Sequence, residues 1–386
     1  MKNIKNVLLI NQSAELYGSD KVLLHIVRAL RDSGIYHPIV ILPTEGELRT
    51  SLCDLGVETH VAPVGKISRS SFSPAGIYKL AQELLASGSR FDAAIAGRDI
   101  YLVHSNTLSV LSGGIWSRRR GVMHIWHVHE IIRSPPLARP IYALLLRILA
   151  DKVIFVSTAV RDWLAAGSVE IREKSTLVFN GTSEIDADLT RGSFRREIGL
   201  TEENLLVTLA GRINSWKGQR VLVDAARHLR SMCNLDKIKF VIVGDTVGGQ
   251  EDLKEQLQHY IRISGLADYF VLLPFVKNID RVWLDTDIAV VPSTEPEPFG
   301  MVAIEAMAAG VPVVASAHGG LLDIVEHGQS GFLFRPSDPE DLADYLKLLI
   351  EDRDLRYRLG LSGRERQSRL FSLGSQAEAL MNCYME

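Results

Sequence analysis

Short runs of apolar residues recur along the chain, separated by segments in which apolar residues repeat every three or four positions. A short continuous apolar run predicts a strand buried on both faces, and the longer repeat predicts an amphipathic helix. In the first half the predicted strands lie at 7–10, 37–42, 58–62, 101–104, 124–128 and 153–157. In the second half they lie at 205–209, 240–243, 271–273, 288–291 and 311–315. Strands that alternate with helices predict an α/β chain with two parallel sheets, each covered on both faces.

The predicted strand 288–291 leads into the stretch with the most candidate chemistry. A loop rich in proline and acid is followed by a small, apolar helix at about 301–309. Glu297 lies in the loop and Glu305 in the helix, where a charge among apolar residues needs a partner. Phosphate can bind the N–H groups at the start of this helix, which belong to Phe299, Gly300, Met301 and Val302. Backbone donors between two carboxylates suit an activated sugar on a nucleotide diphosphate.

The same stretch resembles a known family. Residues 297–305 read EPFGMVAIE, and the match continues as AMAAGVPVV over 306–314. The run is similar to the signature of family 4, the retaining nucleotide-sugar glycosyltransferases (glycosyl transferases group 1) with the GT-B fold. The resemblance implies that Glu297 contacts the hydroxyls of the donor sugar and that Glu305 contacts those of the ribose. A packing helix with one buried, paired glutamate is the structural alternative.

Two further segments of the second half resemble this family. After the predicted strand 205–209 the chain reads AGRINSWKGQ over 210–219. This run matches a Gly-Arg…Lys-Gly motif in which both cations, here Arg212 and Lys217, hold the diphosphate beside Gly211. After the predicted strand 271–273, Phe275 and Val276 correspond to the turn that lies under the base of the nucleotide. All these residues are therefore expected to bind the donor.

In the first half the resemblance points to two positions. Gly18 precedes the first predicted helix and corresponds to a loop that lies against the donor's diphosphate, although this chain has one glycine where the family has two. His129 follows the strand 124–128 and matches a histidine that contacts the donor sugar, whereas His127 is interpreted as structural. The three histidines at 124–129 lack the cysteines or acids that would complete a metal site.

The resemblance implies a GT-B fold, with two Rossmann-like domains facing a central cleft and the last helix returning to the first domain. The acceptor-binding domain is expected at 1–181, with about 372–386 added, and the nucleotide-sugar domain at 182–371. Fixed cations and the helix start would stabilise the leaving diphosphate, so no metal or other cofactor is required. The triplet Asp285-Thr-Asp287 resembles a metal-binding motif of the other large glycosyltransferase fold and is interpreted here as structural.

The implied reaction is retaining transfer of a hexose type of sugar from a GDP- or UDP-linked donor. The acceptor is expected to be a glycan or a lipid-linked molecule, as in bacterial surface polysaccharide or lipopolysaccharide synthesis of the O-antigen type. Two alternatives stay open. A sugar-nucleotide epimerase of the same fold would convert the donor without an acceptor. A sugar-binding protein without catalysis would not need both Arg212 and Lys217.

Charge is distributed unevenly along the chain. Residues 1–180 hold 21 Lys and Arg against 15 Asp and Glu, while the remainder holds 22 against 31. A basic first half that mixes apolar and basic residues at 66–86 and 115–149 suits an anionic membrane surface or an anionic acceptor, although chance would also explain it. Nucleic acid is not an expected partner, because the basic residues are not interleaved with aromatics and the isoelectric point is about 6.4.

Other features limit the class and the compartment. The first predicted strand is not followed by G-x-G-x-x-G, which argues against a nicotinamide or flavin dehydrogenase. No apolar run approaches the roughly 18 residues that a membrane-spanning helix needs. The three cysteines are scattered, as is common in a reducing compartment. We therefore expect a cytoplasmic enzyme that works as a peripheral protein at the inner face of the cell membrane.

Overall fold

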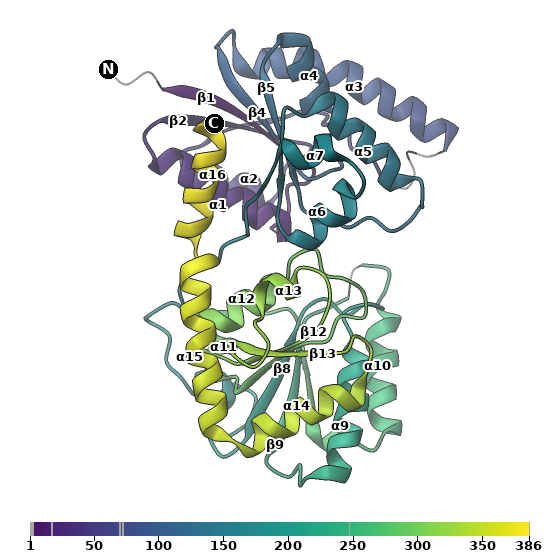
Figure 1. Cartoon of the computed structure of the whole chain (residues 1–386), viewed down its shortest axis with the longest axis vertical. Helices are drawn as coiled ribbons and strands as arrows, with labels where there is room; N and C mark the ends of the chain where they lie inside the picture. The colour runs from purple at the N-terminus through teal and green to yellow at the C-terminus, as the bar shows by residue number, and fades with distance from the viewer. Residues whose placement is uncertain (1–3, 17, 69–70, 72, 247, 386) are drawn as a thin grey trace. The chain divides into compact units, whose positions relative to one another are not determined.

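The computed structural model describes the chain except residues 1–3, 17, 69–70, 72, 247 and 386. The chain forms two compact units (Figure 1), the first made of residues 1–180 and 376–386 and the second of residues 181–375. Each unit has one parallel sheet with helices on both faces. The predicted fold class, two Rossmann-like halves with a last helix that returns to the first, is confirmed. Among the described residues, no helix is long and apolar enough to cross a membrane.

The first unit is built on a seven-stranded sheet in the order β3-β2-β1-β4-β5-β6-β7. Its strands are β1 (Lys5–Asn11), β2 (Tyr36–Leu42), β3 (Glu58–Val61), β4 (Ile100–Asn106), β5 (Met123–Val128), β6 (Lys152–Phe155) and β7 (Ser175–Leu177). Its helices include α1 (Gly18–Asp32), α2 (Glu47–Asp54), α3 (Pro74–Ile95), α4 (Ser112–Arg120), α5 (Ala138–Leu149), α6 (Thr158–Ala165) and α7 (Val169–Glu173). Every strand pair is parallel, as the continuous apolar runs predict.

Alternate residues of β1 belong to two different cores. Val7 and Leu9 pack with residues of α1, whereas Leu8 and Ile10 pack on the opposite face with residues of α3 and α4. This arrangement follows from the period of two in a strand, which sends successive side chains to opposite faces. Both sets are fully buried, so both faces of the central strand are covered.

The helix α16 (Leu373–Met385) completes the core of the first unit from the far end of the sequence. Leu380, Cys383 and Tyr384 are buried in the same core as α1. The hydroxyl of Tyr384 lies 2.5 Å from Nδ1 of His104, and Lys152 Nζ donates to the carbonyl of Cys383 at 3.1 Å. The helix is therefore held by both apolar burial and polar contacts.

The second unit has a six-stranded sheet in the order β10-β9-β8-β11-β12-β13. Its strands are β8 (Leu205–Ala210), β9 (Ile238–Val243), β10 (Phe270–Leu273), β11 (Ile288–Val291), β12 (Val313–Ser316) and β13 (Gly331–Phe334). Its helices include α8 (Ser193–Glu197), α9 (Gln219–Met232), α10 (Asp252–Ile263), α11 (Asp280–Asp285), α12 (Met301–Ala308), α13 (Leu321–Ile324), α14 (Pro339–Glu351) and α15 (Arg353–Leu370).

The strand order of each sheet identifies a position where ligands bind. In the first unit the order reverses between β1 and β4, and in the second between β8 and β11. Loops that leave the carboxyl ends of the strands diverge at such a switch point and open a crevice. The site residues predicted from sequence follow β1 and β5 in the first unit, and β8, β10 and β11 in the second.

The triplet Asp285-Thr-Asp287 anchors the segment that leads into the second unit. Asp285 accepts hydrogen bonds from the backbone N–H groups of Gly192 and Arg195. The buried guanidinium of Arg195 pairs with Asp287 at 2.6 Å, and Asp287 also accepts from the N–H of Leu206. The segment before β8 thus contains helix α8, which these carboxylates hold in place. The contacts agree with a structural role for both aspartates.

Candidate active site

An ion pair between Lys217 and Glu297 lies at the switch point of the second unit. Lys217 follows β8 and Glu297 follows β11, and Nζ of the lysine donates to Oε1 of the glutamate at 2.5 Å. Ser293 Oγ donates to the same oxygen at 2.6 Å. The side chains are 18% and 6% exposed, so the pair is well shielded from water. The structure therefore pairs Lys217, which the sequence analysis assigned to the diphosphate of the donor, with Glu297, which it assigned to the donor sugar.

Glycines allow three loops of this site to pack backbone against backbone. A Cβ on Gly218 would lie 1.8 Å from the carbonyl oxygen of Pro292, at the end of β11. A Cβ on Gly320 would lie 2.6 Å from Cα of Phe299, and the N–H of Gly320 donates to the carbonyl of Glu297. Any larger residue at either position would push the loops apart. The close packing fixes the loop that carries Glu297.

His318 supports the same loop from the carboxyl end of β12. Its Nε2 lies 2.7 Å from the carbonyl oxygen of Ser293, and Thr294 N–H donates to the carbonyl of Trp216. The ammonium of Lys217 lies 4.4 Å from the centre of the Trp216 ring. No role was assigned to His318 from the sequence.

Helix α12 begins where the predicted phosphate-binding N–H groups were placed. Gly300 precedes the helix with φ of 122°, and Ala303 N–H is the first to donate back, to the carbonyl of Gly300. The first N–H groups of a helix have no partner within the helix, so those of Met301 and Val302 are available to an anion. Phe299 is buried against this turn, and Glu305 lies half-buried in the next one. Arg212 is exposed in the loop after β8, beside Gly211.

The turn after β10 is held by Asp245. Its Oδ2 accepts from the N–H of Phe275 at 2.7 Å, and its Oδ1 accepts from Lys254 Nζ at 2.9 Å. The hydrogen bond from Lys254, followed by that from Phe275, lowers the pKa of Asp245. The Phe275 ring is 55% exposed and Val276 is half-buried. Because the N–H of Phe275 already donates to Asp245, a nucleotide base would have to bind other groups of this turn.

In the first unit, polar side chains at the carboxyl ends of β1, β4 and β5 form one hydrogen-bonded network. His129 Nε2 lies 2.8 Å from Asn106 Oδ1, and Asn106 Nδ2 donates to Asn11 Oδ1 at 2.8 Å. Asn11 in turn donates to Asp20 at 2.7 Å. Gly18 is exposed at the start of α1 with φ of 32°, and open space surrounds the position of a Cβ there. Its conformation, not packing, favours glycine.

His129, the first member of this network, is also the end of a row of three histidine rings. The rings of His127 and His129 are 4.1 Å apart, and those of His104 and His127 are 5.3 Å apart. Burial lowers the pKa of His104 and of His129 to about 3, and it also lowers the pKa of His127 well below its ordinary value. All three rings are therefore neutral at physiological pH. No group of three or more possible metal ligands occurs in the described part of the chain.

Glu130 is a site residue that the sequence did not assign. Its Oε2 accepts from the N–H groups of Leu108 at 3.0 Å and of His129 at 3.1 Å. Burial raises the pKa of Glu130 to about 7, because the surroundings penalise the charged carboxylate more than these hydrogen bonds favour it. A carboxyl group poised near neutral pH can give or accept a proton. The sequence signal that could have identified Glu130 is its position just after the buried strand β5.

Comparison with protein families identifies both units. A family described as "Glycosyltransferase Family 4" matches residues 17–184, and one described as "Glycosyl transferases group 1" matches residues 190–366. Among curated proteins, a D-inositol 3-phosphate glycosyltransferase of Stackebrandtia nassauensis is 27% identical over 95% of this chain and 86% of that protein. One of Corynebacterium jeikeium is 35% identical, over 50% of this chain and 46% of that protein.

Solved structures show the same architecture over nearly the full length. Anabaena HepE in complex with UDP superposes with a TM-score of 0.83 at 26% identity, covering 98% of each chain. The same protein in complex with UDP-glucose gives a TM-score of 0.79 at 25% identity, also over 98% of each chain. A glycosyltransferase of Rickettsia africae, at 20% identity and a TM-score of 0.84, shares the fold.

Proposed function

Because the chain belongs to the group 1 glycosyltransferases of the GT-B fold, we propose that it transfers a sugar, with retention, from a nucleotide diphosphate sugar to a glycan or lipid-linked acceptor. The observation that carries the proposal is the shielded Lys217–Glu297 pair beside the start of α12. Glu297 can accept from sugar hydroxyls, while Lys217, Arg212 and the helix start can stabilise the negative charge of the leaving diphosphate. Glu305, one helical turn further on, suits the ribose hydroxyls.

The donor in this proposal is a UDP-sugar, which narrows the choice between GDP and UDP. The support is Anabaena HepE, which has been captured with UDP, with UDP and glucose, and with UDP-glucose. The exposed ring of Phe275 and the half-buried Val276 follow β10 at the edge of the sheet, where a base could stack. An epimerase or a sugar-binding protein is not favoured, because the relatives are glycosyltransferases.

Thermal unfolding with nucleotides tests the donor assignment. A ligand that binds only the folded state stabilises it by about 2.7 kcal/mol at a hundredfold excess over its dissociation constant. We expect UDP to raise the melting temperature and GDP to leave it nearly unchanged at the same concentration. Glu305→Gln should reduce the shift with UDP but not with 2′,3′-dideoxy-UDP, which lacks the hydroxyls. A larger shift with GDP than with UDP would contradict the donor assignment.

Activity should not depend on a divalent metal. The proposed cations for the diphosphate are protein groups, and the Asp285 and Asp287 side chains are engaged by Arg195 and by backbone N–H groups. We expect the transfer rate to persist in excess chelator, measured as release of UDP from the donor. Loss of the rate in chelator and its recovery with manganese would refute this prediction.

The acceptor and the compartment are also part of the proposal. The basic first half suits an anionic acceptor, such as a lipid-linked diphosphate used in surface polysaccharide synthesis of the O-antigen or lipopolysaccharide type. The relative from Stackebrandtia carries D-inositol 3-phosphate in its name, which is an anion as well. Cys53, Cys233 and Cys383 are not joined in disulfides in the described part of the chain, which suits a cytoplasmic protein. Mass spectrometry of the products formed from UDP-glucose with a lipid-linked diphosphate or with D-inositol 3-phosphate would decide between these two acceptors.

A further inference from the structure

Helix α5 of the first unit has two apolar faces, and only one of them is covered. Ala138, Tyr142 and Leu146, spaced four residues apart, are buried against the unit. A second stripe with helical spacing faces solvent, and its members are Leu137, Ile141, Leu144 and Ile148, exposed by 67%, 38%, 52% and 50%. A surface helix normally shows polar residues on its outer face. Three large apolar side chains on one short helix, with a fourth at its N-cap, therefore indicate a surface that binds another molecule.

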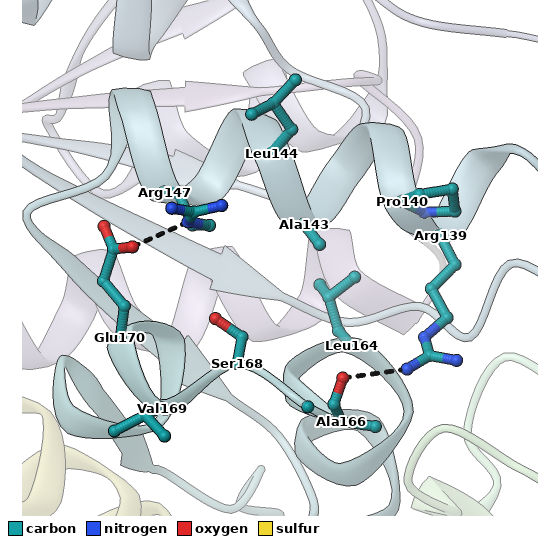
Figure 2. Close-up of a pocket in the computed structure, with 11 residues that line it drawn as sticks. Arg139, Pro140, Ala143, Leu144, Arg147, Leu164, Ala166, Ser168, Val169 and Glu170 are labelled. Carbon is teal, nitrogen blue, oxygen red and sulfur yellow. Dashed lines mark hydrogen bonds and ion pairs between the residues drawn. The ribbon is translucent and has the colours of Figure 1, made fainter.

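A groove runs alongside this helix (Figure 2). It lies between α5 and the segment from α6 to α7, with a cavity volume of about 710 Å³. Ala143, Leu144 and Leu164 contribute apolar side chains to its walls, and Val169, which is 70% exposed, lies on the α7 side. The groove thus extends the exposed apolar stripe beyond the helix itself.

Arginines flank the groove at both ends (Figure 2). Arg139 donates to the carbonyl of Ala166 at 3.1 Å, and Arg147 Nε donates to Glu170 at 2.7 Å. Both bonds hold the guanidinium groups across the opening while leaving other N–H groups toward solvent, since a guanidinium has five donors. Apolar walls between fixed cations suit an amphiphile with an anionic head.

The charge of the surrounding segment is mostly positive. Residues 115–149 contain six arginines and one acid, the half-buried Glu130. Arg118 lies near Lys174, whose ammonium donates to the last carbonyls of α5, so the basic end of α4 adjoins the end of α5. A second copy of this chain, docked symmetrically through the same face, would bring the two sets of arginines together. The charge therefore favours an anionic partner that differs from the protein.

We propose that the outer stripe of α5, the groove beside it and the flanking arginines form a docking surface for an anionic lipid bilayer. The stripe would enter the boundary between headgroups and acyl chains while the arginines contact lipid phosphates. With 12 residues and about 1.5 Å per residue, α5 is too short to span the roughly 30 Å core, so it lies in the interface. None of the residues of this surface is a predicted donor-binding residue, so this inference does not depend on the proposed transfer reaction.

Co-sedimentation with vesicles tests the proposal. We expect the protein to bind vesicles of phosphatidylglycerol and phosphatidylcholine, to bind pure phosphatidylcholine much less, and to lose binding as salt rises. The double variant Leu144→Gln/Ile148→Gln should bind at least about tenfold more weakly, because each side chain loses favourable burial in the lipid. Arg139→Gln/Arg147→Gln should weaken binding and flatten its salt dependence.

A matched control separates the docking surface from general surface hydrophobicity. Leu348 and Leu361 are exposed by 49% and 47% on helices of the second unit. The variant Leu348→Gln/Leu361→Gln should bind vesicles like the wild type, and all variants should keep the thermal shift with UDP. Equal binding by the Leu144→Gln/Ile148→Gln variant and the wild type would overturn the proposal. So would absence of vesicle binding, or a dimer in light scattering that this variant dissociates.

Discussion

The variant Lys217→Ala should lose activity by a factor of roughly 10² to 10³ in kcat/KM, the range seen when one donor to a developing negative charge is removed. It should also lose stability, because the shielded carboxylate of Glu297 would keep, among the described residues, the Ser293 hydroxyl as its remaining side-chain donor. Breaking a buried ion pair by removing one partner typically costs about 3–5 kcal/mol. Initial rates of UDP release and chemical denaturation measure the two effects.

The double variant Lys217→Ala/Glu297→Gln distinguishes a structural pair from a site that binds the donor. Removing the charge of Glu297 as well should recover most of the stability, because no isolated charge is left behind. Activity should stay low, since neither group is present to act on the donor. Lys347→Ala, which removes an exposed pair with Glu351, serves as the matched control and should change neither quantity appreciably. Recovery of activity in the double variant would refute the donor-binding role.

The first unit should lose stability steeply as the pH falls below about 6.5. His104, His124 and His127 are fully buried, and burial lowers the pKa of the first two to about 3 and about 4. The pKa of His127 also lies well below its ordinary value. Burial also lowers the pKa of His25 and of His129, so the unfolded chain takes up at least three protons that the folded unit refuses. Stability is therefore present above pH 6.5 and is lost below it. Each proton contributes about 1.4 kcal/mol per pH unit.

Glu130 opposes this trend over part of the range. Its pKa of about 7 in the folded unit lies above its ordinary value, so the folded unit holds this proton more tightly than the unfolded chain. Between pH 6.5 and about 4.5 this lowers the net excess by one proton, to at least two, which leaves a slope of at least about 3 kcal/mol per pH unit. Denaturation with urea at several pH values measures this slope.

A substitution at His127 checks the origin of the slope. Neither ring nitrogen of His127 has a hydrogen-bond partner among the described residues. Replacing it with leucine should therefore be tolerated at pH 7 and should reduce the slope by about 1.4 kcal/mol per pH unit. His228→Leu, at a partly exposed position in the second unit, is the control and should leave the slope unchanged. A slope that does not respond to His127→Leu would exclude the buried histidines as its cause.

The architecture was predictable because it depends on patterns that are local in sequence. Apolar runs gave β11 at its observed bounds, and the helix predicted at 301–309 corresponds to α12 at Met301–Ala308. The motif around Glu297 likewise placed a glycine before the helix. The match of both halves to glycosyltransferase families confirms the recognition that these motifs supported. The roles assigned to individual donor-binding residues remain predictions.

What escaped prediction depends on residues that are distant in sequence. Lys217 and Glu297 are separated by 80 positions, and only the parallel pairing of β8 with β11 brings their loops together. Glu130 titrates near neutral pH because of the burial around it, which no local pattern encodes. Arg195 is buried, and its guanidinium donates to the carbonyl of Asp285 and to the carboxylate of Asp287, which lie 90 and 92 positions away in the sequence. Each of these features depends on burial in the folded structure and not on a local sequence pattern.

The return of α16 to the first unit has a consequence for synthesis of the protein. Domains generally fold as units while the chain is being made, with the N-terminal one first. Here Leu380 and Tyr384, which are translated after the whole second unit, fill the core of the first and cover His104. On the ribosome the second unit can therefore be complete while the first still lacks part of its core. The domain that is translated first is the one that is finished last.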